Sequence, residues 1–174
     1  AMRDEAERLR ERFVAEGLPE VAIGAGLNSG PMNVGNMGSE FRRSYTVLGD
    51  SVNLGSRLEG LTKFYGADIV ISEATAAGLG DEFLLRRLDR VQVKGREEPL
   101  TIYEPLCPLA EAGPEQRAEV EAHERALEAY WGRDWETARR LFGDLAGDHP
   151  QTHLYWLFLE RMAETDPIAD LPAD

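Results

Sequence analysis

Residues 45–59 read YTVLGDSVNLGSRLE, and they carry the most informative pattern in the sequence. The residues at 44–48 (SYTVL) are rich in β-branched and aromatic side chains, which predicts a short strand. Gly49 and Asp50 then supply a turn. From residue 51 to 64 the spacing of apolar side chains becomes helical. One buried stripe can hold the apolar residues of this segment, namely Val52, Leu54, Leu58, Leu61 and Phe64.

The opposite face of this predicted helix is polar near its start. Asn53 and Arg57 lie four residues apart, so both project from the same side of the first turns. An amide and a guanidinium beside a helix N-terminus can contact an oxyanion or a phosphate group. The pattern alone also fits an ordinary solvated helix face, and that alternative stays open at this point.

The segments around this stretch predict strands interleaved with helices. A charged amphipathic helix is expected at 3–16, a glycine-punctuated strand at 21–29 and a strand–turn–strand unit at 30–39. Downstream we expect a strand at 68–71, a helix at 73–79 and two strands at 83–94 and 100–106, with a turn at 95–99. The predicted fold class is α+β, with helices on a mixed or antiparallel sheet.

The composition changes near residue 108. Prolines and a glycine at 105–114 mark a linker at 108–114, which separates residues 1–107 from helices expected at 115–131, 135–147 and 152–164. The helical tail therefore spans 115–165, and residues 166–174 form a frayed end. Within it, one spacing resembles that of the second helix of a tetratricopeptide repeat. The residues at its offsets 0, 3, 7, 10 and 15 are Trp135, Ala138, Phe142, Leu145 and Pro150. An appendage that packs on its neighbours and a docking or dimer-supporting module both remain open.

Charge excludes some partners. The 174 residues include 32 acidic and 19 basic side chains, for a net charge of −13, of which −9 falls on residues 108–174. Binding to nucleic acid or to an anionic membrane surface is disfavoured, because both depend on basic residues. One cysteine, Cys107, and the lack of an apolar run of about 20 residues predict a cytoplasmic location for this segment. The three histidines, His123, His149 and His153, are expected at surfaces or helix ends.

Several sequence motifs resemble those of the class III nucleotidyl cyclases. YTVLGDSVNLGSRLE is similar to the family's Y-T/D-x-x-G-x-x-V-N-x-A-x-R signature, with Gly55 in place of the usual alanine. IGAGLNSGPMNVGNMGS at 23–39 is similar to a glycine-rich hairpin region, and VQVKGREEPLTIYE at 91–104 to the closing hairpin. Arg42 and Tyr45 keep the family's R-x-x-Y-T spacing. These four motifs occur in the family's order across most of residues 1–107. The resemblance implies the C-terminal part of a ferredoxin-like cyclase catalytic domain.

The resemblance also implies a reaction and roles for five residues. In the family, the 3′-hydroxyl of ATP attacks its own α-phosphate and releases pyrophosphate and cyclic AMP. By position, Thr46 matches the residue that reads the purine, Asn53 the one that orients the ribose and Arg57 the one that stabilises the α-phosphate. Lys94 matches a lysine that holds the terminal phosphates, and Arg42 is a weaker phosphate candidate. In the family, a threonine at the position of Thr46 accompanies selectivity for adenine, although guanylate cyclase activity stays an alternative.

The family's metal site is missing from the sequence. The resemblance implies two Mg²⁺ or Mn²⁺ ions held by aspartates of two upstream motifs, neither of which occurs here. We therefore expect further sequence before residue 1 in the parent protein, no metal ligand in this chain and no turnover by the chain alone. Family sites form between two catalytic domains, which implies a homodimer. A non-catalytic module that senses nucleotide or only dimerises is the competing hypothesis, and an upstream membrane anchor stays open.

Overall fold

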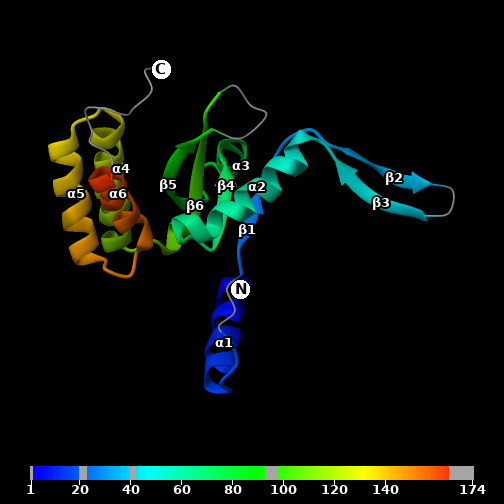
Figure 1. Cartoon of the computed structure of the whole chain (residues 1–174), viewed down its shortest axis with the longest axis horizontal. Coiled ribbons are helices and arrows are strands. Elements are labelled where there is room, and N and C mark those ends of the chain that lie inside the picture. Colours follow the sequence, from blue (N-terminus) through cyan, green and yellow to red (C-terminus); the bar gives the residue numbers. More distant parts are fainter. Residues whose placement is uncertain (1, 20–22, 40–41, 93–97, 165–174) are drawn as a thin grey trace.

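A computed structural model describes residues 2–19, 23–39, 42–92 and 98–164 of the chain. The described residues form the expected α+β fold with a helical C-terminal part (Figure 1). In chain order the elements are α1 (Met2–Ala15), β1 (Ala25–Leu27), β2 (Asn33–Ser39), β3 (Arg42–Leu48), α2 (Asp50–Tyr65), β4 (Ile69–Ser72), α3 (Glu73–Leu79), β5 (Phe83–Val91), β6 (Leu100–Pro108), the short 3₁₀ helix η1 (Leu109–Glu111), α4 (Pro114–Trp131), α5 (Trp135–Asp148) and α6 (His153–Glu164).

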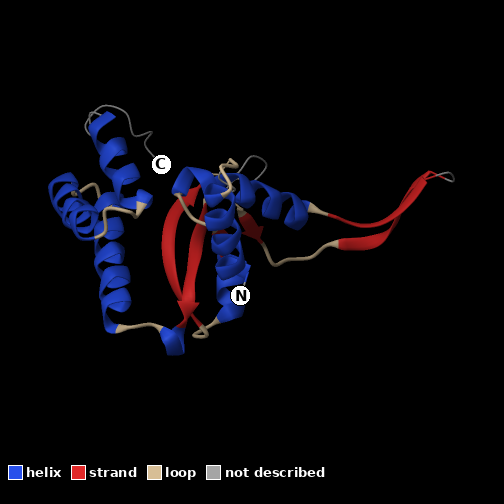
Figure 2. Cartoon of the chain, turned by 90° about the horizontal axis from the view of Figure 1, so that it is seen from below, coloured by secondary structure: helices blue, strands red, loops and turns tan. Residues whose placement is uncertain are grey.

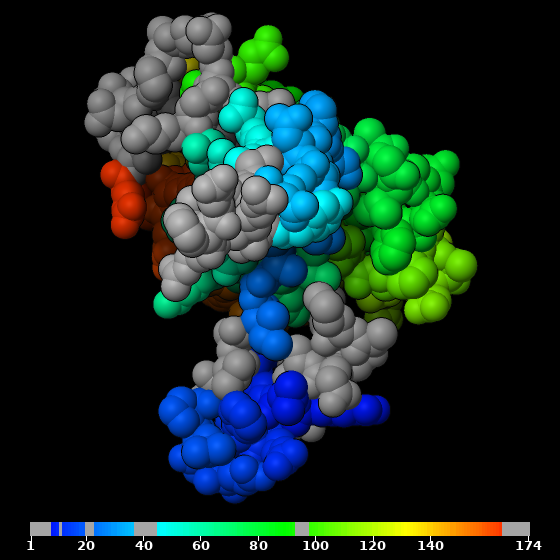
Figure 3. Space-filling view, turned by 90° about the vertical axis from the view of Figure 1, so that its right-hand side faces the viewer, coloured from blue at the N-terminus to red at the C-terminus, as the bar shows by residue number. Residues whose placement is uncertain are grey.

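The main sheet has four strands in the order β1-β4-β6-β5. Strands β1 and β4 run parallel, and the other neighbours pair antiparallel, so the sheet is mixed. The tail helices α4, α5 and α6 lie beside β5, whereas the β2–β3 hairpin projects from the other side of the molecule (Figures 1 and 2). Helix α1 stands below the sheet, set apart from it (Figures 1 and 3).

The prediction of a strand–turn–strand unit within residues 30–39 is wrong. Residues 33–39 form one continuous strand, which pairs with β3 from Asn33 opposite Leu48 to Ser39 opposite Arg42. The glycines of this segment resembled turn signals, yet Gly35 sits in open space within the strand. The hairpin leaves apolar side chains exposed, including Tyr45 at 75% and Val34 at 53%.

Helix α2 buries a stripe that differs from the predicted one in its last turn. Leu54 and Leu58 are buried as expected, but Phe64 is 47% exposed and Tyr65 is buried instead. With 3.6 residues per turn, Tyr65 lies within about 20° of Leu54 around the helix axis, whereas Phe64 is roughly 80° away. The helix ends at Gly66, whose φ of 65° is the left-handed conformation that glycine adopts without strain.

The tail shares one hydrophobic core with the sheet and α2. A single cluster joins side chains of all three parts, namely Leu54, Leu58, Tyr65, Val70, Leu88, Leu100, Ile102, Ala126, Leu127, Phe142, Leu145, Leu154, Tyr155, Leu157 and Phe158, among others. The expected linker at 108–114 holds the end of β6, η1 and the start of α4. The tail is therefore packed on the neighbouring sheet over a continuous core.

The expectation for the histidines is wrong for His123. Its side chain is fully buried between α4 and its neighbours, with its ring 5.9 Å from that of Phe142 and 5.5 Å from that of Tyr155. His149 caps the C-terminus of α5 and His153 begins α6, in agreement with helix-end positions. A histidine on the apolar face of an amphipathic helix is buried with that face, because the apolar face packs against the core.

Candidate functional site

The candidate site is a cavity of about 690 Å³ at the N-terminal end of α2. It is bounded by the end of β1 and the loop that follows, by the first turns of α2, and by single residues of α3 and β6. Its lining consists of Asn28, Ser29, Gly30, Pro31, Asp50, Ser51, Leu54, Arg57, Ala74 and Leu100. The lining is mixed, with one guanidinium, one carboxylate and several hydroxyl or amide groups beside apolar side chains.

The structure brings one member of the predicted pair on α2, Arg57, to the lining of this cavity, and Asn53 is not among the lining residues. Asn53 stands one turn before Arg57 on the same helix. Both side chains are exposed, so a ligand could reach them. The geometry agrees with the spacing argument, because residues four apart on a helix share a face.

The start of α2 is shaped to receive a polar ligand. Its N-cap residue is Gly49, which has a φ of 150° and offers no side chain to the first backbone amides. Amides at a helix N-terminus without a capping side chain can bind an anion or water. Asp50 is the first residue of the helix and lines the cavity, so it is not the cap itself.

Hydrogen bonds hold the loop after β1 against α2. The Asn28 Nδ2 atom donates to the backbone oxygen of Ser51 over 2.9 Å. A Cβ atom added at Gly30 would lie 2.4 Å from the Ser51 hydroxyl oxygen, so a larger residue there would require the Ser51 side chain to move. Ser29 and Thr75 share a hydrogen bond of 3.1 Å between their hydroxyl oxygens, which ties the same loop to α3.

Sequence reasoning missed the residues of this loop. Asn28, Ser29 and Gly30 directly follow a strand rich in glycine, and such a strand indicates a close approach of another backbone. That signal could have shown that another element lies close to the loop. The identity of the approaching element could not be read from the sequence, since it depends on the sheet order.

Of the other predicted site residues, the structure describes the surroundings of Thr46 alone, and Thr46 is not among the lining residues. Thr46 lies on β3, opposite Gly35 and half-buried, in the hairpin that leads into α2. Arg42 begins β3, but its side chain lies outside the described part of the structure. Lys94 lies outside the described residues altogether. The assignments of Thr46, Arg42 and Lys94 therefore stay predictions.

No metal centre is formed by the residues that the structure describes. Among them, no three His, Cys, Asp or Glu side chains are grouped so that they could hold a metal ion. Asp50 supplies one carboxylate to the cavity, and a site for two divalent ions needs several oxygen ligands. The described residues thus do not fit a two-metal site.

The fold and the helix-borne Asn–Arg pair define a nucleotidyl cyclase type of catalytic domain. A family model described as the adenylate and guanylate cyclase catalytic domain matches residues 6–104. This chain belongs to that family, as the class III motifs predicted. The matched region ends before the helical tail, and the tetratricopeptide likeness of the tail stays a prediction.

Similar proteins include bacterial adenylate cyclases. The chain is 44% identical to an adenylate cyclase of Anabaena cylindrica over 91 residues, which are 51% of this chain and 18% of the relative. It is 38% identical to adenylate cyclase 1 of Rhizobium meliloti over 104 residues, or 60% of this chain and 16% of the relative. The chain thus spans less than a fifth of these curated relatives.

Solved structures agree in fold. The adenylyl cyclase CyaB from P. aeruginosa matches with a TM-score of 0.55 and 33% identity, over 64% of this chain and 57% of that one. The guanylyl cyclase Cya2 matches with a TM-score of 0.50 and 32% identity, over 63% and 53%. Separately, none of the helices in the described residues is both long enough and apolar enough to cross a bilayer.

Proposed function

We propose that this chain is the nucleotide-contacting part of an adenylate cyclase, which converts ATP to cyclic AMP and pyrophosphate. The observation that carries the proposal is the placement of Asn53 and Arg57 on one exposed face of α2, where Arg57 lines a cavity of mixed polar and apolar character. In this proposal Asn53 orients the ribose, and Arg57 stabilises the charge that develops on the α-phosphate as the 3′-hydroxyl attacks it.

The remaining contacts follow the same assignment. Thr46 reads the purine edge, while Lys94 and Arg42 hold the phosphates. The divalent ions that the family requires would be bound by the aspartates of the two upstream motifs, which do not occur in this sequence. The names of the relatives from Anabaena and Rhizobium favour ATP as the substrate.

A homodimer is proposed as the active form. The β2–β3 hairpin projects away from the sheet (Figures 1 and 2). It leaves Val34, Tyr45, Val47 and Leu48 exposed. A projecting strand pair with exposed apolar side chains is suited to contact with a second copy. The proposed active site would then combine α2 of one copy with the metal-binding segment of the other.

Measurement of cyclic AMP formation by the parent protein tests the proposal. With ATP and Mn²⁺, Arg57→Ala should lower kcat by about 10²–10³-fold, as expected for loss of a group that stabilises charge in the transition state. Arg140→Ala is the matched control, since Arg140 lies exposed on α5 with only a surface contact to Asp144 at 3.7 Å. An Arg57→Ala enzyme with near-normal kcat would contradict the assignment.

One observation favours a second candidate, a non-catalytic module that binds nucleotide or only dimerises. The described residues lack a metal site, and a degenerate cyclase domain would lack one throughout. The two candidates differ in one result: a parent protein that binds ATP, contains the upstream segment and forms no cyclic AMP with Mn²⁺ would support the module. For this 174-residue chain alone we expect no cyclic AMP formation in either case.

A further inference from the structure

The C-terminal end of α2 is held by the helical tail through one carboxylate. The Tyr65 hydroxyl, at the last residue of α2, donates to the Asp89 Oδ2 atom of β5 over 2.9 Å. The Arg161 Nη1 atom of α6 donates to the same oxygen over 2.7 Å. The Arg161 Nη2 atom also lies 3.4 Å from the Tyr65 hydroxyl oxygen, so the three groups close a triangle.

This triangle lies in a protected environment. Tyr65 and Asp89 are 2% and 6% exposed, and the guanidinium of Arg161 completes their hydrogen bonding. Burial, together with the charge of Asp89, raises the pKa of Tyr65 above its usual value. Charge-assisted hydrogen bonds away from water are short and directional, so this contact fixes where the end of α2 lies.

Two further contacts join α6 to the same end of α2. A Cβ atom added at Gly66, directly after α2, would lie 2.7 Å from the His153 Cβ atom at the start of α6. The Arg161 guanidinium also stands over three aromatic rings, those of Phe64, Tyr65 and Phe158, at 5.3, 5.7 and 5.2 Å from their centroids. The backbone of the helix end and the side chain of Arg161 are therefore both packed.

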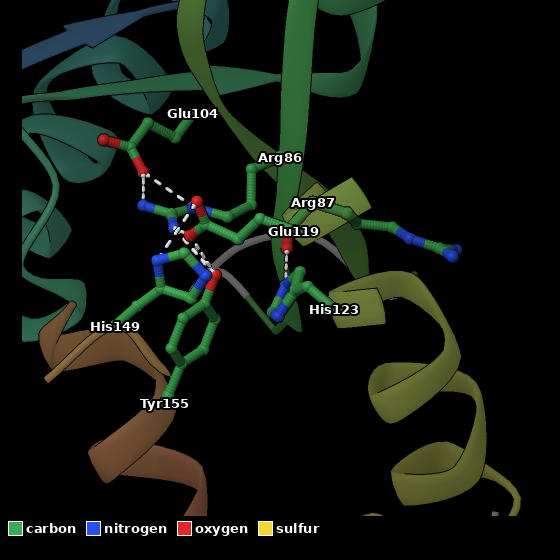
Figure 4. A network of polar contacts seen from close by, with 7 residues as sticks. All are labelled: Arg86, Arg87, Glu104, Glu119, His123, His149 and Tyr155. Atoms are coloured by element: carbon green, nitrogen blue, oxygen red, sulfur yellow. Dashed lines mark hydrogen bonds and ion pairs between the residues drawn. The ribbon is translucent and has the colours of Figure 1, made fainter. Parts of the chain in front are cut away.

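The tail is itself anchored to the sheet independently of Arg161. Arg86 of β5 donates to Glu104 of β6 over 2.7 Å, to Glu119 of α4 over 3.2 Å and to the Tyr155 hydroxyl of α6 over 3.1 Å (Figure 4). Glu119 also accepts a hydrogen bond from Tyr155. This network gives the tail a fixed place on β5, from which Arg161 reaches α2.

The geometry points to a role for this contact in the site: we propose that the helical tail positions α2, with Arg161 as the positioning residue. The other half of α2 is seated on β1 and its loop, through Gly26 and the Asn28 hydrogen bond to Ser51. A continuous helix transmits the placement of its last turn to the residues about two to four turns earlier. The inference rests on the proposed function only for the roles given to Asn53 and Arg57.

The placement of α2 can be measured in this chain without substrate. In ¹H–¹⁵N spectra, Arg161→Met should shift the Arg57 Nε–Hε resonance and the backbone amides of residues 51–57. Arg161→Lys keeps a cation for Asp89 and should restore most of the wild-type positions. Glu128→Gln is the matched control: it removes a tail-to-sheet ion pair, that of Arg87 with Glu128 at 2.8 Å, but does not touch α2. Its spectrum should leave residues 51–57 unmoved.

A purely structural role for Arg161 gives a different result. The melting temperature would then fall in Arg161→Met while the resonances of residues 51–57 stay at their wild-type positions, and that outcome overturns the proposal. Equal shifts in Glu128→Gln would overturn it as well, since any loss of tail contact would then have the same effect.

Activity separates this proposal from the proposed function. In an active parent protein, Arg161→Met should lower kcat by about 10-fold to 100-fold, because a small misplacement of a catalytic group is costly. Arg161→Lys should recover most of that loss. A parent protein without cyclase activity would refute the proposed function, while the spectra would still decide whether Arg161 positions α2.

Discussion

The buried imidazole of His123 makes the stability of this protein depend on pH in a way that can be worked out from its contacts. Its Nε2 atom lies 2.7 Å from the backbone oxygen of Arg87, and a carbonyl oxygen only accepts, so Nε2 carries the hydrogen. Its Nδ1 atom is buried with no hydrogen-bond partner among the described residues. Protonation would place a charge on that nitrogen inside the core.

The pKa of His123 is lowered from its usual 6.5 to about 3, chiefly by burial, with the nearby Arg86 and Arg87 adding to the effect. The folded-state pKa lies below the unfolded-state value, so the unfolded state binds the proton first as the pH falls. The free energy of unfolding is therefore not reduced by His123 well above pH 6.5, and it decreases as the pH falls below 6.5. Each unit of pH then costs about 1.4 kcal/mol, so from pH 7.5 to pH 5 the loss is about 2 kcal/mol.

The assay is denaturant unfolding of wild type and His123→Gln between pH 5 and pH 7.5. Glutamine keeps a donor for the Arg87 oxygen but does not titrate, and the carboxylates titrate alike in both proteins. The free energy of unfolding of wild type should fall relative to the variant by about 2 kcal/mol over this range. A parallel pH dependence in the two proteins, or an imidazole that titrates near pH 6.5 in the folded state by NMR, would refute the reasoning.

Three further predictions concern the contact between α2 and β1, the residue proposed to read the base, and the buried ion pair between β5 and β6. Gly26→Ala should destabilise the fold by about 1–3 kcal/mol, because its Cβ would lie 2.2 Å from the backbone oxygen of Gly55; Gly55→Ala should instead gain about 1 kcal/mol, as its Cβ would meet only the Gly26 oxygen at 3.7 Å. Denaturant unfolding measures both. Thr46→Cys in the parent protein should lower the ratio of kcat/KM for ATP to that for GTP, and an unchanged ratio would remove Thr46 from base recognition. Glu104→Leu should lower the free energy of unfolding by about 3 kcal/mol, because it leaves the buried Arg86 without its nearest carboxylate. Adding Arg86→Met to the same chain should recover part of this loss. If the two substitutions were simply additive in a double-mutant cycle, the pairing would be contradicted.

Much of the fold follows from local patterns in the sequence. The helix at 73–79 begins at a serine whose hydroxyl accepts from the Thr75 amide over 3.2 Å, and its predicted bounds match α3. The strands at 69–72 and 100–108 and the three tail helices lie within a few residues of their predicted positions. Such elements are predictable because apolar periodicity and helix-capping residues act over a few positions.

The candidate site is predictable only in part, for the same reason. The four-residue spacing of Asn53 and Arg57 is enough to place both on one face of α2. The placement of Arg57 at one cavity with Asn28, Ser29 and Ala74 depends on the parallel pairing of β1 with β4, and long-range pairing leaves little trace in local spacing. The contribution of this loop to the cavity therefore cannot be predicted from local sequence patterns.

The cyclase family, the α+β class and the polar face of α2 can all be predicted from the amino-acid sequence, because motifs and periodicity are local properties of the chain. Only the tertiary structure decided that the acidic tail shares a core with the sheet, that His123 is buried and that Arg161 reaches Asp89 from 72 positions away. Those contacts join residues far apart in the chain, and their energy comes from burial that exists only once the sheet, α2 and the tail are packed together.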